Sequence, residues 1–74
     1  MADTRREALD RSLTNQTPSE EQIQRIEILR MWGQDLGHTI LDHTEPSREQ
    51  SLALTHLEET VMWAVKAIVL EEGE

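Results

Sequence analysis

Two long segments with helical periodicity lie on either side of a very short link, and this arrangement constrains the fold more than any other feature. The link is Thr44-Glu45-Pro46. Because so short a link leaves no room for a crossover, the two helices must pack as antiparallel neighbours. A chain of 74 residues makes at most one domain. The sequence therefore predicts an all-α fold whose ordered part is an antiparallel two-helix hairpin.

Each predicted helix begins at a capping signal. The segment Thr17-Pro18-Ser19-Glu20 supplies an N-cap hydroxyl, a proline for the first helical position and a glutamate for the third. The second helix has a similar capping box, with Ser47 as N-cap and Gln50 at the third position. We expect the first helix to end near residues 42–43, and we assign the hairpin to residues 17–70.

Apolar residues recur at alternating spacings of three and four in both helices, which is the pattern of packed helices rather than strands. In the first helix the stripe is Ile26, Leu29, Gly33, Leu36 and Ile40. In the second helix it is Leu54, Leu57, Val61, Ala64 and Ile68. We expect these two stripes to form the seam of the hairpin. Gly33 and Gly37 lie one turn apart and permit close approach, although each costs roughly 1 kcal/mol of helical propensity relative to alanine.

The second helix carries more apolar surface than one partner helix covers. Met62, Val65 and Val69 lie off the seam, with Trp63 nearby. A chain this short buries too little surface to be comfortably stable alone, and without cysteine it has no disulfide to help. We therefore expect self-association into a homo-oligomer, with Trp32 and Trp63 as core or interface anchors.

The segments outside the hairpin are polar. Residues 1–16 are predicted to form an N-terminal arm, or a short helix from about Thr4 to Ser12, because so few apolar positions support a longer one. Residues 71–74 form an acidic tail. Carboxylates at the C-terminus of a helix oppose its macrodipole, so we expect this tail to fray.

The net charge of −8, from seven Lys and Arg against fifteen Asp and Glu, disfavours polymeric nucleic acids and anionic membrane surfaces as partners. A small anionic ligand stays open, because a few converging arginines overcome a weak mean field at contact distance. No apolar run reaches the length of a membrane span, and the first residues lack the apolar stretch of a signal peptide. We expect a cytoplasmic protein.

Catalytic and metal-binding patterns find little support, and we expect no catalytic residue, no metal and no cofactor. The acid pairs Glu20-Glu21 and Glu58-Glu59 are adjacent in helices, where side chains diverge. His56 and Glu59 share a helix face but supply only half of a metal site. Glycine-rich phosphate loops and nucleophile elbows do not occur in the sequence.

The cations of the hairpin are candidates for binding an anion. Arg25 and Arg30 are five residues apart and project differently from the first helix, while Arg48 lies near the hairpin tip. For each arginine the competing interpretation is a surface ion pair, for example Arg25 with Glu21 one turn earlier.

The run SREQSLALTHLEETVMWAVKAI, which begins at Ser47, closely resembles the second-helix motif of a phage anti-defence hairpin domain. This domain is shared by anti-CBASS cyclic-oligonucleotide sponges and the anti-Thoeris sponge. The first helix is similar to the same family in its spaced residues Pro18, Gln22, Arg25, Glu27 and Arg30. The resemblance covers roughly residues 12–70.

The resemblance implies a homo-oligomer, hexameric in characterised relatives, that binds cyclic di- or trinucleotide immune signals and does not cleave them. It places Arg30 at the family's helix-one cation, with Arg25 nearby. It places Asn15 at the arm position where relatives stack an aromatic side chain on the bases; Asn15 has no ring. Candidates for a separate cyclic-trinucleotide pocket are Arg48, Ser51 and Thr55.

Two other functions stay open on the sequence. One is a structural module that oligomerises and scaffolds another protein, and the more distant one is an enzyme acting on nucleotides. Arginines gathered around a concave pocket would favour ligand binding, whereas arginines scattered in surface ion pairs would favour scaffolding.

Overall fold

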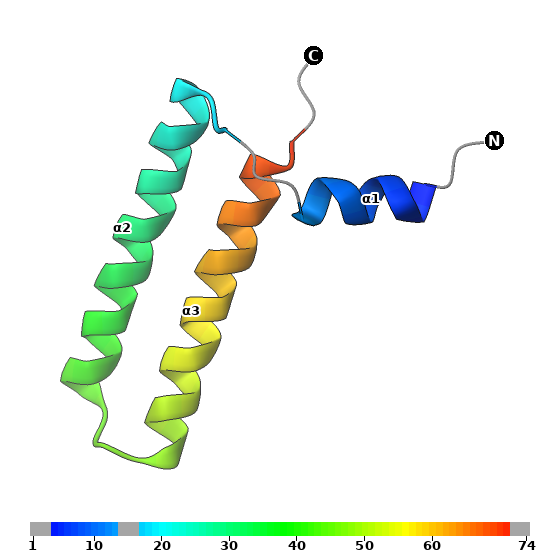
Figure 1. Ribbon diagram of the computed structural model, residues 1–74. Coiled ribbons are helices and arrows are strands. Elements are labelled where there is room, and N and C mark those ends of the chain that lie inside the picture. The colour runs from blue at the N-terminus through cyan, green and yellow to red at the C-terminus, as the bar shows by residue number, and fades with distance from the viewer. Residues whose placement is uncertain (1–3, 14–16, 72–74) are drawn as a thin grey trace.

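The protein is a helical hairpin with a short additional helix at its open end (Figure 1). The computed structural model describes residues 4–13 and 17–71. The helices are α1 (Thr4–Leu13), α2 (Glu20–His43) and α3 (Arg48–Val69), and the described residues contain no strand. Helices α2 and α3 lie side by side and antiparallel, whereas α1 projects away from them beside the end of α3. The predicted all-α hairpin is confirmed.

The start of α2 differs from the prediction. Ser19, not Thr17, is the N-cap, and Pro18 precedes the helix instead of occupying its first turn. The Ser19 hydroxyl accepts a hydrogen bond from the backbone N–H of Gln22 at 3.1 Å, and Gln22 Oε1 accepts from the Ser19 N–H at 2.9 Å. This reciprocal pair satisfies two exposed donors at once, which a cap at Thr17 with Glu20 does not achieve here.

The short link is organised by side chains on both of its ends. Ser47 caps α3 by accepting from the Gln50 N–H at 3.0 Å, as predicted. The Gln50 side chain does not return to Ser47; it donates to the Thr44 hydroxyl at 2.9 Å and to the Thr44 carbonyl at 3.2 Å. Gln50 therefore ties the start of α3 to the C-cap of α2 across the link.

The seam between α2 and α3 follows the predicted stripes with one exception. Ile26 and Ile68 are the most buried apolar side chains in the described ranges, at 6% and 8% exposure. Leu36 is 50% exposed and does not lie in the seam. Gly37 lies there instead, against Leu57, because the step from Gly33 to the next seam position is four residues and not three.

Two side chains, one from α2 and one from α1, hold the open end of the hairpin by donating to backbone carbonyls at the end of α3. Gln22 Nε2 donates to the carbonyl of Ile68 at 2.9 Å, which joins the first turn of α2 to the last turn of α3. The Arg11 guanidinium donates to the carbonyl of Leu70 and attaches α1 at the same place. Both carbonyls lie at the C-terminus of α3, where intrahelical partners are lacking; the carbonyl of Ile68 also accepts a hydrogen bond from the backbone N–H of Glu71 at 3.1 Å.

Much apolar surface stays exposed on the hairpin. Trp32 is 66% exposed and Trp63 is 58% exposed, so neither is a core residue of the single chain. Lys66 Nζ lies 5.6 Å from the ring centroid of Trp63, a cation–π distance. Within residues 4–13 and 17–71, no helix combines the length and the apolar character that crossing a bilayer demands.

Candidate functional site

An open groove of about 500 Å³ lies between α2 and α3 on one side of the seam. Its α2 wall is formed by Arg30, Gly33 and Gln34. Its α3 wall is formed by Leu54, Leu57, Glu58, Val61, Met62 and Val65. The groove falls within the size range of small-molecule clefts, roughly 300 to 1,000 Å³. Most of its lining is apolar, with a guanidinium, an amide and a carboxylate around it.

Arg30 is placed on the groove by the geometry of α2. Gly33 faces α3, and Arg30 and Gln34 are one turn apart on the neighbouring side of the helix. Arg30 is exposed, and in the part of the chain that the structure describes it makes no hydrogen bond or ion pair. Its planar fork is therefore available to a ligand, and this geometry suits a phosphate or an acceptor edge of a base.

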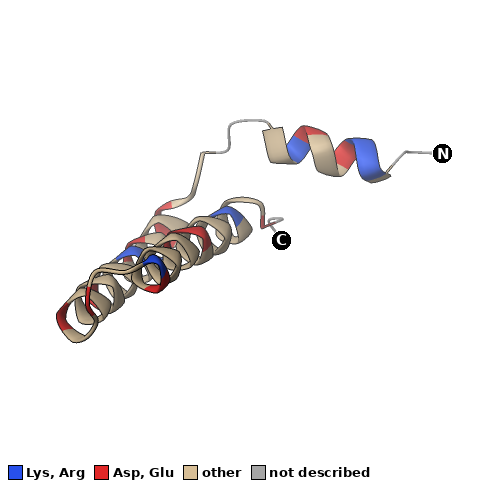
Figure 2. Ribbon diagram, turned by 90° about the horizontal axis from the view of Figure 1, so that it is seen from below, with Lys and Arg blue, Asp and Glu red and all other residues tan. Residues whose placement is uncertain are grey.

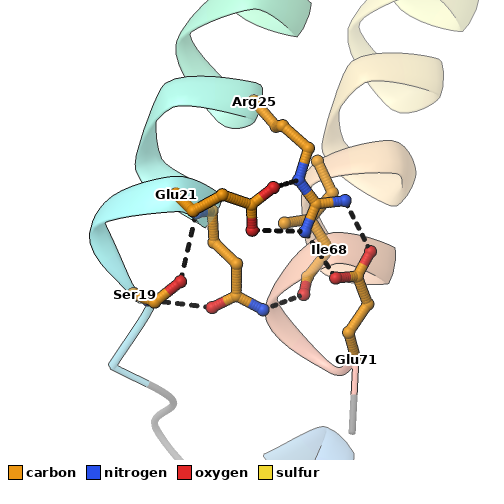
Figure 3. Close-up of polar contacts among 6 residues, drawn as sticks. Ser19, Glu21, Arg25, Ile68 and Glu71 are labelled. Atoms are coloured by element: carbon orange, nitrogen blue, oxygen red, sulfur yellow. Dashed lines mark hydrogen bonds and ion pairs between the residues drawn. The ribbon is translucent and has the colours of Figure 1, made fainter. Parts of the chain in front are cut away.

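Arg25, in contrast, is already engaged at the open end of the hairpin (Figure 3). Its Nη1 and Nη2 donate to the two carboxylate oxygens of Glu71, at 2.9 and 2.5 Å. Its Nε lies 2.8 Å from Glu21 Oε1 in the ion pair that the sequence suggested as the alternative for this residue. We refer to Glu21, Arg25 and Glu71 as the latch, because they join the start of α2 to the segment after α3.

The remaining predicted site residues do not line the groove. Arg48, Ser51 and Thr55 lie on α3 and are exposed. Their spacing of three and four residues continues to Glu58 and Met62, so all five follow one side of α3 toward the groove. Asn15 lies outside the described residues. Ligand contact by these residues stays a prediction.

The groove brings together residues that the sequence analysis placed in two separate predictions, one for self-association and one for ligand binding. Met62 and Val65 belong to the apolar set expected to drive self-association, and they line the same groove as Arg30. Gln34 and Glu58 are groove residues that the sequence alone does not identify. The spacing could have indicated Gln34, since it follows Arg30 by one turn and shares its face of α2. The place of Glu58 depends on how α3 packs against α2.

Charged residues are dispersed along the hairpin, and Figure 2 shows Lys and Arg at separate places, interleaved with acidic residues. His56 Nδ1 and Glu59 Oε1 are 3.9 Å apart, as their shared face predicted. Over the described ranges, no three His, Asp or Glu side chains gather in a way that could hold a metal ion.

A family model of the Acb2/Tad1 hairpin domain matches residues 6–69, which is most of the chain. The chain belongs to the Acb2/Tad1 hairpin family. This family is known for cyclic-oligonucleotide-binding anti-defence proteins, the sponges of the anti-CBASS and anti-Thoeris systems. Neither the curated proteins nor the solved structures gave a match to this sequence.

The Acb2/Tad1 match includes most of α1 together with the hairpin, and it ends before Glu71. Arg30 and the whole groove lie inside the matched region, whereas the latch takes one of its two carboxylates from beyond it. Of the acidic tail, residues 72–74 lie outside the described residues; Glu71 follows the end of α3 and is held by two hydrogen bonds from Arg25.

The latch of this Acb2/Tad1 hairpin should respond to acid. The pKa of Glu71 lies below its ordinary value of 4.5, chiefly because its carboxylate accepts hydrogen bonds from Arg25. The same hydrogen bonds raise the pKa of Arg25. Because the folded-state pKa of Glu71 is lowered, its stabilisation is complete above pH 4.5 and is lost as the pH falls through the lowered value.

We therefore predict that Glu71→Gln lowers the melting temperature at neutral pH, and that the difference from the wild type shrinks as the pH falls below 4.5. The effect should be small because both partners are partly exposed to solvent. Thermal unfolding followed by circular dichroism measures it. Glu45→Gln, in the exposed link, is the matched control. If Glu71→Gln follows the wild type as closely as Glu45→Gln does, the latch contributes nothing.

Proposed function

We propose that this protein binds cyclic di- or trinucleotide immune signals and sequesters them intact, as a phage anti-defence sponge in the host-cell cytoplasm. The observation that carries the proposal is the groove of an Acb2/Tad1 hairpin in which Arg30 has no partner within the described residues. A guanidinium without an internal partner at an apolar groove suits a ligand that combines flat rings with anionic phosphates.

Sequestration, as opposed to cleavage, is supported by the chemistry of the groove side chains. Among the described residues that line the groove, the ionisable ones are Arg30 and Glu58, and none is a serine, histidine or lysine of the kind that forms a nucleophile and its activating base. Tight binding without turnover would lower the free concentration of the signal and leave the host effector without its activator.

We further propose that the functional form is a homo-oligomer, a hexamer as the family resemblance implies. Exposed apolar side chains support this proposal, because Met62, Trp32 and Trp63 are each more than half exposed in the single chain. Because Met62 also lines the groove, a neighbouring copy would complete the walls around Arg30.

Native mass spectrometry with a panel of cyclic di- and trinucleotides tests stoichiometry and ligand together. We expect an oligomer at micromolar concentration that carries a fixed number of ligands, each recovered intact after heat release. Linearised nucleotide above a control without protein would contradict sequestration as the whole mechanism. A mass near that of one chain would contradict the oligomer.

The second candidate is a structural module that oligomerises and scaffolds another protein. It is favoured by the exposed Trp32 and Trp63 and by the ion pairing of Arg25, which was the pattern expected of a scaffold. An oligomer that binds no member of the nucleotide panel in the same experiment would support this candidate over the sponge.

A further inference from the structure

Arg30 and Glu58 stand on opposite walls of the groove and carry opposite charges, yet no ion pair joins them among the residues that the structure describes. Arg30 comes from α2 and Glu58 from α3. A guanidinium and a carboxylate that line one groove can form an ion pair with each other when their side chains come close enough. Here the groove presents a set of donors on one wall and a pair of acceptors on the other.

The space between them is apolar. Leu54, Leu57, Val61, Met62 and Val65 line the groove. A ligand that fills it must offer a hydrophobic body, acceptors toward Arg30 and N–H donors toward Glu58. A phosphate cannot satisfy the last requirement, because an ionised carboxylate accepts hydrogen bonds and repels another anion.

Among the nucleobases, guanine meets all three requirements. Its O6 and N7 form an acceptor edge that the arginine fork recognises in a bidentate manner. Its neighbouring N1–H and N2–H groups form a donor edge that matches the two oxygens of a carboxylate. Adenine presents an amino donor beside N7 where guanine presents O6, so it both loses an acceptor for Arg30 and lacks the paired donors for Glu58.

We propose that Glu58 is a specificity-determining residue that selects guanine-containing cyclic oligonucleotides, with the base in the groove and its N1–H and N2–H groups directed at the carboxylate. This inference rests on the proposed function, since it names the base that the same groove takes. The phosphates of the ligand then lie away from Glu58, because two anions repel each other.

Calorimetric titration with cyclic di-GMP and cyclic di-AMP tests the inference on three proteins: wild type, Glu58→Gln and Glu59→Gln. Glu59→Gln is the matched control. It removes the same charge one residue away, at a position that is not among the residues lining the groove. We expect the wild type to prefer cyclic di-GMP. Glu58→Gln should weaken cyclic di-GMP binding by roughly tenfold to a hundredfold, the range of charge-assisted hydrogen bonds, and should change cyclic di-AMP binding much less.

A third ligand tests whether the 2-amino group of guanine contributes to the preference for cyclic di-GMP. Cyclic di-IMP has the guanine ring without the 2-amino group, so the wild type should bind it more weakly than cyclic di-GMP, and Glu58→Gln should reduce that gap. Glu59→Gln should behave as the wild type with all three ligands.

The outcomes separate this inference from the proposed function. Equal binding of the guanine and adenine ligands, or an equal effect of Glu58→Gln on both, would overturn base selection and leave sequestration standing. Failure of every cyclic oligonucleotide to bind would overturn the proposed function and the inference with it. If Glu58→Gln changes the oligomer mass and not the ligand preference, the groove is a contact between copies of the chain, and base selection is again overturned.

Discussion

Arg30→Ala is expected to weaken binding of the best cyclic oligonucleotide by roughly tenfold to a hundredfold per site, or about 1.5 to 3 kcal/mol. The physical reason is the loss of charge-assisted hydrogen bonds from a guanidinium that lines the groove and has no internal partner in the described part of the chain. Helicity and oligomer mass should change little, because Arg30 is exposed and lies outside the α2–α3 seam.

Calorimetric titration against the wild type measures this loss, with Arg30→Lys as the companion variant. Lysine keeps the charge and loses the planar fork, so it should recover only part of the affinity. Circular dichroism and light scattering on the same samples separate a binding residue from a structural one. An unchanged affinity in an intact oligomer would mean that the ligand binds elsewhere.

Gly33→Ala and Gly37→Ala should change stability in opposite directions. A Cβ atom at residue 33 would lie 2.7 Å from Cγ2 of Val61, a contact that real Cβ atoms do not make without movement. Val61 is β-branched, and such side chains strongly prefer one rotamer in a helix, so we expect it not to yield easily. Overpacking costs about 1 to 3 kcal/mol, and over most of this range it outweighs the helical propensity of about 1 kcal/mol that alanine gains.

At residue 37 the added Cβ would lie 3.5 Å from Cδ2 of Leu57, an ordinary van der Waals contact. Gly37→Ala should therefore stabilise the hairpin by about 0.5 to 1 kcal/mol. Urea unfolding at matched protein concentration compares the two variants, since association with other copies shifts apparent stability. In a Val61→Ala background, Gly33→Ala should no longer destabilise. A loss that persists in this background would refute the clash with Val61.

The helical hairpin was predictable from local features of the sequence. Helical periodicity, capping residues and a link of a few residues are local signals, and local signals leave antiparallel packing as the available arrangement. The same reading anticipated the ion pair of Arg25 with Glu21 and the cap at Ser47, because each joins residues within one turn of each other. It placed the start of α2 too early, since Thr17 and Ser19 are both competent caps and only the bonded geometry distinguishes them.

The contacts between residues from distant parts of the chain depend on how the helices pack. The rotation of α2 against α3 placed Gly37 in the seam and left Leu36 exposed, and it set Glu58 across the groove from Arg30. It also brought Glu71 of the acidic tail to Arg25. The spacing of residues along one helix indicates which side chains share a face. Which residues of another helix contact that face depends on the packing angle and the offset of the two helices, and no local sequence pattern encodes these.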